Sequence, residues 1–111
     1  MALAHTSSGQ IVKLDTLEAQ ATDTCALLKA DDLELMWLVL PAGKAVQSHA
    51  VSTSMTLQCL RGRVEVRLDT SVKLLEAGEV MYLAGGLPHG LRALDESRLL
   101  MTLVLPASRT G

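Results

Sequence analysis

Hydrophobic and polar residues alternate in short segments along most of this chain, and turn-forming residues separate the segments. The clearest case is residues 63–69, where valines and a leucine alternate with charged side chains. Successive side chains on a β-strand point to opposite faces, so this pattern predicts a strand with one buried face. Residues 33–40 are almost continuously apolar and end at Pro41, which favours a strand buried on both faces.

The remaining segments predict more strands and almost no helix. A short helical turn is expected only over residues 15–20. Many short strands separated by turns are typical of an all-β sandwich or barrel, and a closed antiparallel double sheet fits this pattern best. The further predicted strands are residues 10–14, 25–29, 55–60, 72–75, 79–83, 89–94 and 98–105.

The length and composition indicate one globular domain over residues 1–111. Hydrophobic residues make up 49% of the chain and charged residues 20%, which is ordinary for a folded protein. We expect the barrel core at about residues 33–105 and an N-terminal strand or arm at about residues 9–30. The chain has no Phe, one Trp and one Tyr. Its core must therefore be built from Leu, Val, Ala and Met.

Charge and hydropathy exclude several classes of partner. The formal net charge is −2, and no basic stripe is present to neutralise phosphates, so nucleic acid is not an expected partner. No apolar run approaches the roughly 18 residues of a membrane span. The N-terminus lacks the pattern of a signal peptide, and Cys25 and Cys59 form no CxxC motif. The expectation is a cytoplasmic protein with two free thiols.

Two of the three histidines are framed by glycines. His49 lies between Gly43 and Gly62, and His89 closely follows Gly86. These two segments resemble the paired motifs of the cupin superfamily, and the resemblance covers somewhat more than half of the chain. It implies a small single-domain, RmlC-like cupin, whose fold is an antiparallel jelly-roll barrel also called a double-stranded β-helix. The strand pattern between the two segments agrees with that implication.

The same resemblance bears on a metal site. In cupins, three histidines and a glutamate hold a divalent metal such as Fe, Mn, Ni, Cu or Zn. Here the four family positions hold His49, Val51, Met55 and His89. Val51 cannot coordinate a metal, and the thioether of Met55 suits Cu(I) better than Fe(II) or Zn(II). The resemblance therefore implies a metal at the two histidines that is held weakly or not at all.

Two further side chains are alternative ligands, although neither stands at a family ligand position. The orientation of Glu34 depends on the parity of its strand, and Cys59 has the same parity as Met55, so a regular strand places those two on one face. The residues predicted to line the pocket inside the barrel are Met36, Val51, Met55, Cys59 and Tyr82.

Two functions from different classes follow. In the first, the barrel binds a small organic ligand in a cavity lined by aliphatic side chains, with the histidines at its mouth. In the second, the protein is a metal-dependent dioxygenase, isomerase or decarboxylase that uses His49 and His89 with an incomplete ligand shell. A histidine acting as a general acid–base without metal is a variant of the second. The missing ligands favour the first function, while the sequence leaves catalysis undecided and identifies no catalytic residue.

The resemblance also implies a homodimer, because small cupins often pair through their N-terminal strands. The apolar residues Ile11 and Val12, together with residues 33–40, would suit burial at such an interface.

Overall fold

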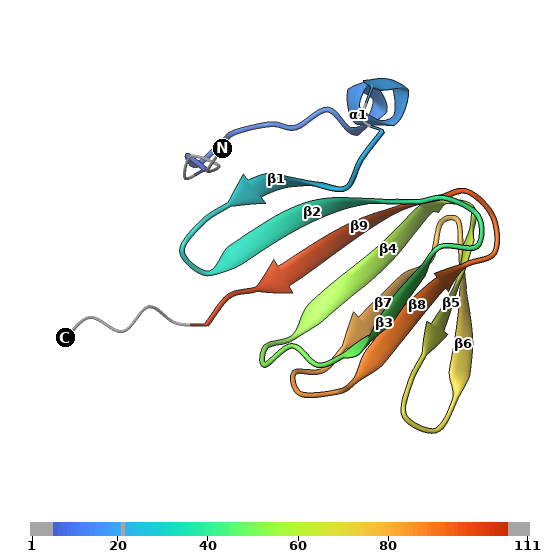
Figure 1. The fold of residues 1–111 in the computed structure, drawn as a ribbon. Helices are drawn as coiled ribbons and strands as arrows, with labels where there is room; N and C mark the ends of the chain where they lie inside the picture. The colour runs from blue at the N-terminus through green and yellow to red at the C-terminus, as the bar shows by residue number, and fades with distance from the viewer. Residues whose placement is uncertain (1–5, 21, 107–111) are drawn as a thin grey trace.

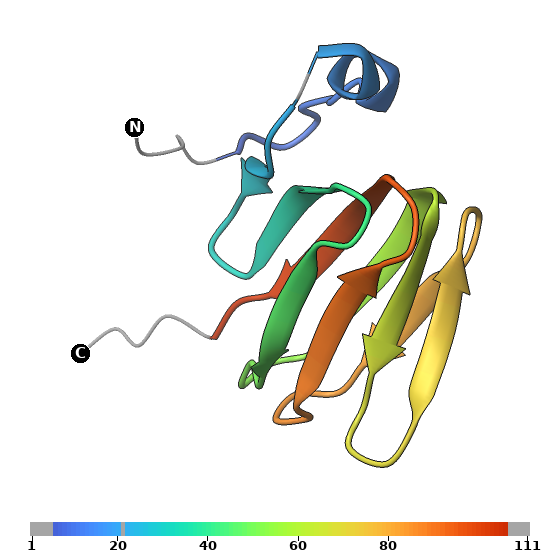
Figure 2. The same cartoon turned by 45° about the vertical axis from the view of Figure 1, so that its right-hand side comes forward.

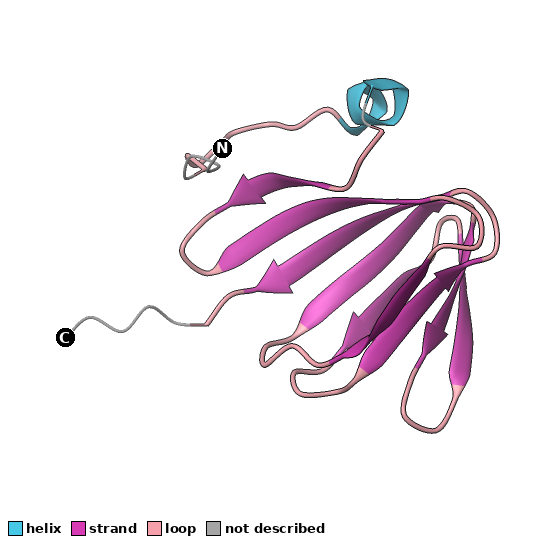
Figure 3. Cartoon of the chain, in the orientation of Figure 1, coloured by secondary structure: helices cyan, strands magenta, loops and turns pink. Residues whose placement is uncertain are grey.

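The computed structural model describes residues 6–20 and 22–106, and strands make up most of them (Figures 1 and 3). Within these residues there are one short helix and nine strands. The elements are α1 (Leu14–Gln20), β1 (Cys25–Lys29), β2 (Leu33–Leu40), β3 (Ala45–His49), β4 (Met55–Arg61), β5 (Arg63–Arg67), β6 (Val72–Glu76), β7 (Val80–Leu83), β8 (His89–Ala93) and β9 (Ser97–Val104).

The strands form two antiparallel sheets that face each other (Figure 2). One sheet has five strands in the order β1-β2-β9-β4-β7, and the other has four in the order β3-β8-β5-β6. Strands that are distant in sequence therefore lie side by side, as β2 and β9 do over their full lengths. The predicted all-β double sheet, with at most one short helical turn, is confirmed.

The core lies between the inner faces of the two sheets. Leu57 and Leu99 project from the five-stranded sheet, and Val64 and Val66 from the four-stranded sheet, all with no exposed surface. Their neighbours in β5, Arg63 and Arg67, are exposed, as the alternation in the sequence predicts. The buried cluster consists of Leu38, Leu40, Met55, Leu57, Cys59, Val64, Val66, Leu75, Leu83, Leu91, Ala93 and Leu99.

Neither large aromatic side chain belongs to this cluster. Trp37 is only 1% exposed, but it lies on the face of β2 opposite to Leu38 and packs outside the core between the sheets. Tyr82 is 66% exposed, whereas the adjacent Leu83 is buried. The hydrophobic cluster between the sheets therefore consists of aliphatic and sulfur-containing side chains.

The chain passes from one sheet to the other at Gly62, between β4 and β5. Gly62 has a φ of 86°, in the left-handed region. A Cβ here would collide with the Ser97 hydroxyl oxygen and lie 2.5 Å from the carbonyl oxygen of Glu96. The Ser97 hydroxyl donates to the carbonyl oxygen of Asp95 at 2.8 Å, which fixes the turn into β9. The corner thus requires a glycine for both conformation and space.

Two sequence-based assignments of secondary structure differ from the structure. Residues 10–13 are not a strand, because no neighbouring strand pairs with them and Ile11 is 83% exposed; the chain enters α1 at Leu14 instead. Strand β3 was not predicted, because Ala45, Gln47, Ser48 and His49 lack the β-branched pattern of a strand. It forms through its pairing with β8.

The other predicted strands are confirmed to within two residues at each end. The helix in the described residues is too short and too polar to cross a membrane.

Replacing Gly62 with alanine is expected to destabilise the protein far more than the same change at Gly43. Both residues have a positive φ, so each substitution carries about 1–2 kcal/mol of backbone strain. A Cβ at Gly43 meets nothing within 4 Å, whereas one at Gly62 also forces the backbone at Ser97 to move, which adds about 1–3 kcal/mol. Urea denaturation of the two variants measures the difference in the free energy of unfolding, and equal losses would contradict this account.

Candidate functional site

Strands β3 and β8 bring the two histidine segments together. The strands are antiparallel neighbours, and His49 and His89 are paired Cα positions in their register. The ladder is irregular between Val46 and His49, which is the mark of a β-bulge. The backbones of the two sequence-predicted metal ligands are therefore adjacent. The side chain of His49 lies outside the described part of the structure.

His89 is a buried side chain that faces the space between the sheets. It is 4% exposed, and it lines an interior cavity. Its Nδ1 lies 3.3 Å from the carbonyl oxygen of Leu87. A carbonyl oxygen can only accept a hydrogen bond, so Nδ1 is the protonated nitrogen in this contact. The bond fixes the orientation of the ring.

The cavity between the sheets has a volume of about 320 Å³. This lies at the small end of the range for ligand pockets. Its polar side chains are His89, Lys44 and Thr24, and no carboxylate is among the described residues that line it. The apolar residues that line it are Leu38, Val39, Leu40, Val46, Val51, Met55, Leu57, Leu91, Met101 and Leu103.

The two basic side chains of the cavity lie at opposite ends of the β3–β8 pair. Lys44 precedes β3, and its carbonyl oxygen accepts a hydrogen bond from the amide of Ala93, the last residue of β8. His89 is the first residue of β8. The length of this strand separates the two ends by roughly 13 Å. Lys44 is exposed and His89 is buried, so the two basic groups differ in their access to solvent.

The five residues predicted to line the pocket are divided between different places. Val51 and Met55 line the cavity. Met36 packs against the edge of the core, and Cys59 is fully buried at the Gly62 corner, with its sulfur 3.4 Å from the carbonyl oxygen of Arg61.

Tyr82 points away from the cavity. Since Leu83 faces the core, the preceding residue on β7 must face outward. The Tyr82 hydroxyl lies 3.2 Å from the Ser54 hydroxyl on that outer side.

Several cavity residues were missed by sequence reasoning. Leu57 and Leu91 share the strand parity of Met55 and His89, so alternation was a signal that could have identified them. Lys44 and Thr24 lie outside the strands, and no periodic signal marks them. Thr24 is placed by a hydrogen bond that its hydroxyl accepts from the amide of Val39 at 3.0 Å.

Within the described part of the chain, too few donor side chains lie around His89 to form a metal site. Among the described residues, no three His, Cys, Asp or Glu side chains lie close enough together to hold a metal ion. Val51 and Met55, at the other family positions, present an alkyl group and a thioether to the cavity. Glu34 pairs with Leu103 and so shares the inner face of β2, but it does not line the cavity. A zinc or non-haem iron site needs at least three protein ligands.

Comparison with solved structures identifies the fold. A cupin superfamily protein from Desulfitobacterium hafniense superimposes with a TM-score of 0.77 at 14% identity, covering 96% of this chain and 100% of that one. An RmlC-like cupin from Shewanella frigidimarina gives 0.69 at 21% identity over 73% of each chain. A conserved protein of unknown function from Streptococcus pyogenes gives 0.75 at 18% identity, covering 97% and 100%.

The chain therefore has the cupin fold that its glycine-framed histidines predicted. No family model matches the sequence, and no curated protein matches it either.

The two cysteines are expected to differ sharply in reactivity. Burial raises the pKa of the Cys59 thiol, with smaller contributions from the charges of Glu79 and Glu76, so its thiolate is disfavoured. Cys25 is partly exposed. Titration of the native protein with a chromogenic disulfide should show one fast and one slow thiol. The Cys59→Ser variant should keep the fast phase, and loss of that phase would contradict the assignment.

Proposed function

We propose that this protein binds a small, largely apolar organic acid in the cavity between its sheets, without using a metal. The observation that carries the proposal is the composition of the cavity wall. The wall is mostly aliphatic, with an exposed lysine, Lys44, and a buried histidine, His89, at opposite ends of the β3–β8 pair. This arrangement is complementary to a ligand with an apolar body and an anionic group.

Burial of the apolar body would supply most of the affinity. Each methylene group moved from water into an apolar site contributes about 0.8 kcal/mol. The wall bears no described carboxylate that would repel an acid, and Lys44 is a cation at the point where the acid group would emerge. An exposed lysine adds only a modest attraction, so its main role is to orient the ligand.

His89 would meet the other end of the ligand. The contact of Nδ1 with the carbonyl oxygen of Leu87 fixes the orientation of the ring at this end of the cavity. Acid–base catalysis by this ring would be helped by a carboxylate that orients the imidazole and stabilises its protonated form. No carboxylate lines the cavity among the described residues to serve that purpose. The geometry therefore favours binding over acid–base chemistry.

A metal-dependent enzyme is the second candidate, and the adjacency of His49 and His89 is the observation that favours it. Two imidazoles would have to be completed by water or by the ligand. Because the positions of Val51 and Met55 provide no oxygen or nitrogen donor, we propose that the cavity works without a metal.

Octanoate is the probe for the apolar cavity. We expect saturable binding of octanoate, measured by isothermal titration calorimetry. The Val46→Phe variant, which fills the cavity from β3, should weaken binding at least about tenfold. The matched control is Val104→Phe, since Val104 is 42% exposed on β9 and does not line the cavity.

Calorimetry also has outcomes that would contradict the proposal. No binding of octanoate to the wild-type protein would refute it. Equal loss of affinity in Val46→Phe and Val104→Phe would place the ligand elsewhere. An intact melting temperature in both variants, checked by thermal unfolding, shows that any loss is not caused by misfolding.

Restoring the two missing ligand types should create metal binding that the natural chain lacks. The double variant Val51→His, Met55→Glu is expected to gain several degrees of melting temperature with Zn(II) or Ni(II), reversed by a chelator. Without metal it should be less stable than wild type, since Met55 is only 4% exposed and its replacement buries a carboxyl group. A chelator-reversible rise of similar size in the wild type would instead support the metalloenzyme.

A further inference from the structure

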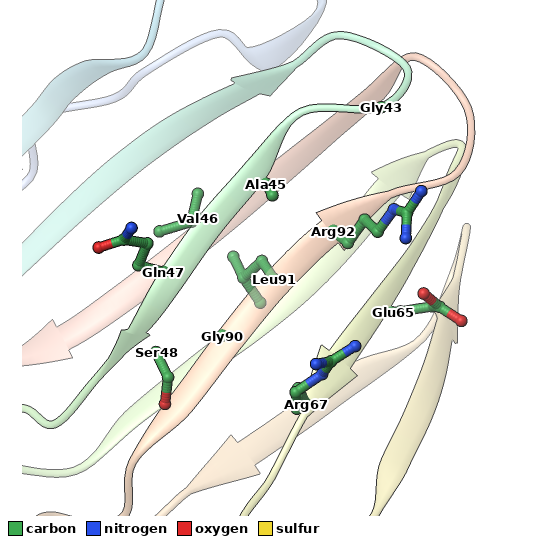
Figure 4. Close-up of a pocket in the computed structure, with 10 residues that line it drawn as sticks. All are labelled: Gly43, Ala45, Val46, Gln47, Ser48, Glu65, Arg67, Gly90, Leu91 and Arg92. Carbon is green, nitrogen blue, oxygen red and sulfur yellow. The ribbon is translucent and has the colours of Figure 1, made fainter.

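A second hollow lies on the outer face of the four-stranded sheet, on the opposite side from the apolar cavity. Its volume is about 400 Å³, and residues from β3, β8 and β5 line it (Figure 4). Gly90 has no side chain to fill this space. A Cβ on Gly90 would lie 3.2 Å from the carbonyl oxygen of Val46 and 3.3 Å from the amide nitrogen of Ser48. The bulged part of β3 thus lies close over β8 because residue 90 is a glycine.

Two arginines flank the hollow, and neither has an ionic partner within the described residues. Arg67 on β5 pairs in register with Gly90, and Arg92 lies two residues further along β8 on the same face. Arg63, on the same face of β5, is neutralised by Asp95 at 2.7 Å, which raises the pKa of the arginine. No such contact is made by Arg67 or Arg92.

The third charge in the hollow is negative. Glu65 pairs in register with Arg92, and both side chains line the hollow with Arg67 (Figure 4). Two guanidinium groups and one carboxylate leave a net charge of about +1, because each guanidinium group stays protonated. The hollow therefore matches a monoanion better than a dianion. The carboxylate also offers an acceptor for a hydroxyl group of a ligand, and Ser48 contributes a hydroxyl of its own.

We propose that this outer hollow, which we call the Arg67–Arg92 groove, binds a hydroxylated monocarboxylate. The guanidinium groups of Arg67 and Arg92 would hold the ligand carboxylate, since planar guanidinium and carboxylate groups form paired charge-assisted hydrogen bonds. Glu65 and Ser48 would bind the ligand hydroxyl groups. The apolar cavity is a poorer match for such a ligand, because most of its wall is aliphatic and burying several hydroxyl groups there without partners is costly.

The four-stranded sheet separates the groove from the apolar cavity, although Val46 and Leu91 border both. Leu91, whose side chain faces inward, lies between Gly90 and Arg92 on β8, so the sheet itself stands between the two sites. Binding in the groove therefore does not depend on the function proposed for the interior.

Gluconate is a suitable probe, because it is a monoanion that carries several hydroxyl groups. In a titration followed by two-dimensional NMR of the ¹⁵N-labelled protein, we expect saturable shifts of the amides of Arg67, Gly90 and Arg92. The Arg67→Gln and Arg92→Gln variants should each weaken binding about tenfold or more, as loss of a charge-assisted hydrogen bond implies. Absence of saturable shifts in the wild-type protein would overturn the proposal.

The control variant is Lys73→Gln, which removes an exposed cation from β6 of the same sheet without touching the groove. It should bind gluconate as the wild type does, and an equal loss in this variant would mean that only net charge matters. A competition titration with inorganic phosphate tests whether the groove prefers a hydroxylated monocarboxylate. Displacement of gluconate by equimolar phosphate would overturn the specificity for a hydroxylated monocarboxylate.

Octanoate in the same NMR experiment separates this inference from the proposed function. It should shift the amides of Leu57 and Met101, which line the interior cavity but not the groove, and leave that of Arg67 unmoved. Gluconate binding without octanoate binding would refute the interior site alone, and the reverse would refute the groove alone.

Discussion

The packing of two sheets through aliphatic side chains is the constraint on which the rest of the structure depends. Near the Gly62 corner, side chains from both sheets meet, and Cys59, Val64 and Leu99 are wholly buried. Toward β3 the same kinds of side chain do not fill the gap. The chain has no Phe, Trp37 packs outside the core, and Tyr82 faces outward. A cavity of about 320 Å³ remains because no large side chain enters it.

Alternation and turn residues predicted much of the fold. The strand over residues 25–29 and that over residues 33–40 were located to the residue, since turns bound each of them. Residues 10–14 show the limit of this reasoning, because an apolar pair such as Ile11 and Val12 forms a strand only where another strand lies beside it. Strand β3 shows the converse, since its pairing with β8 outweighs its weak local pattern.

The sequence predicted only those residues of the candidate site that lie in recognisable strands or at the family's motif positions. The spacing of the glycines identified His49 and His89 as candidate site residues. In the structure the two residues are paired in the register of β3 and β8. Lys44, which gives the cavity its charge, precedes a strand that the sequence did not reveal. The Arg67–Arg92 groove depends on the β3 bulge and on the register of β5 with β8. Long-range register of this kind is not encoded in any one segment, so sequence reasoning alone could not assemble the groove.

The most direct test of the central claim, that the interior cavity holds an apolar acid without a metal, is a crystal structure of the protein grown with octanoate. The account predicts an alkyl chain between the sheets in contact with Leu57 and Leu91, with its carboxylate toward Lys44. A metal ion bound by His49 and His89, or octanoate bound only on the outer surface with the cavity closed, would contradict it.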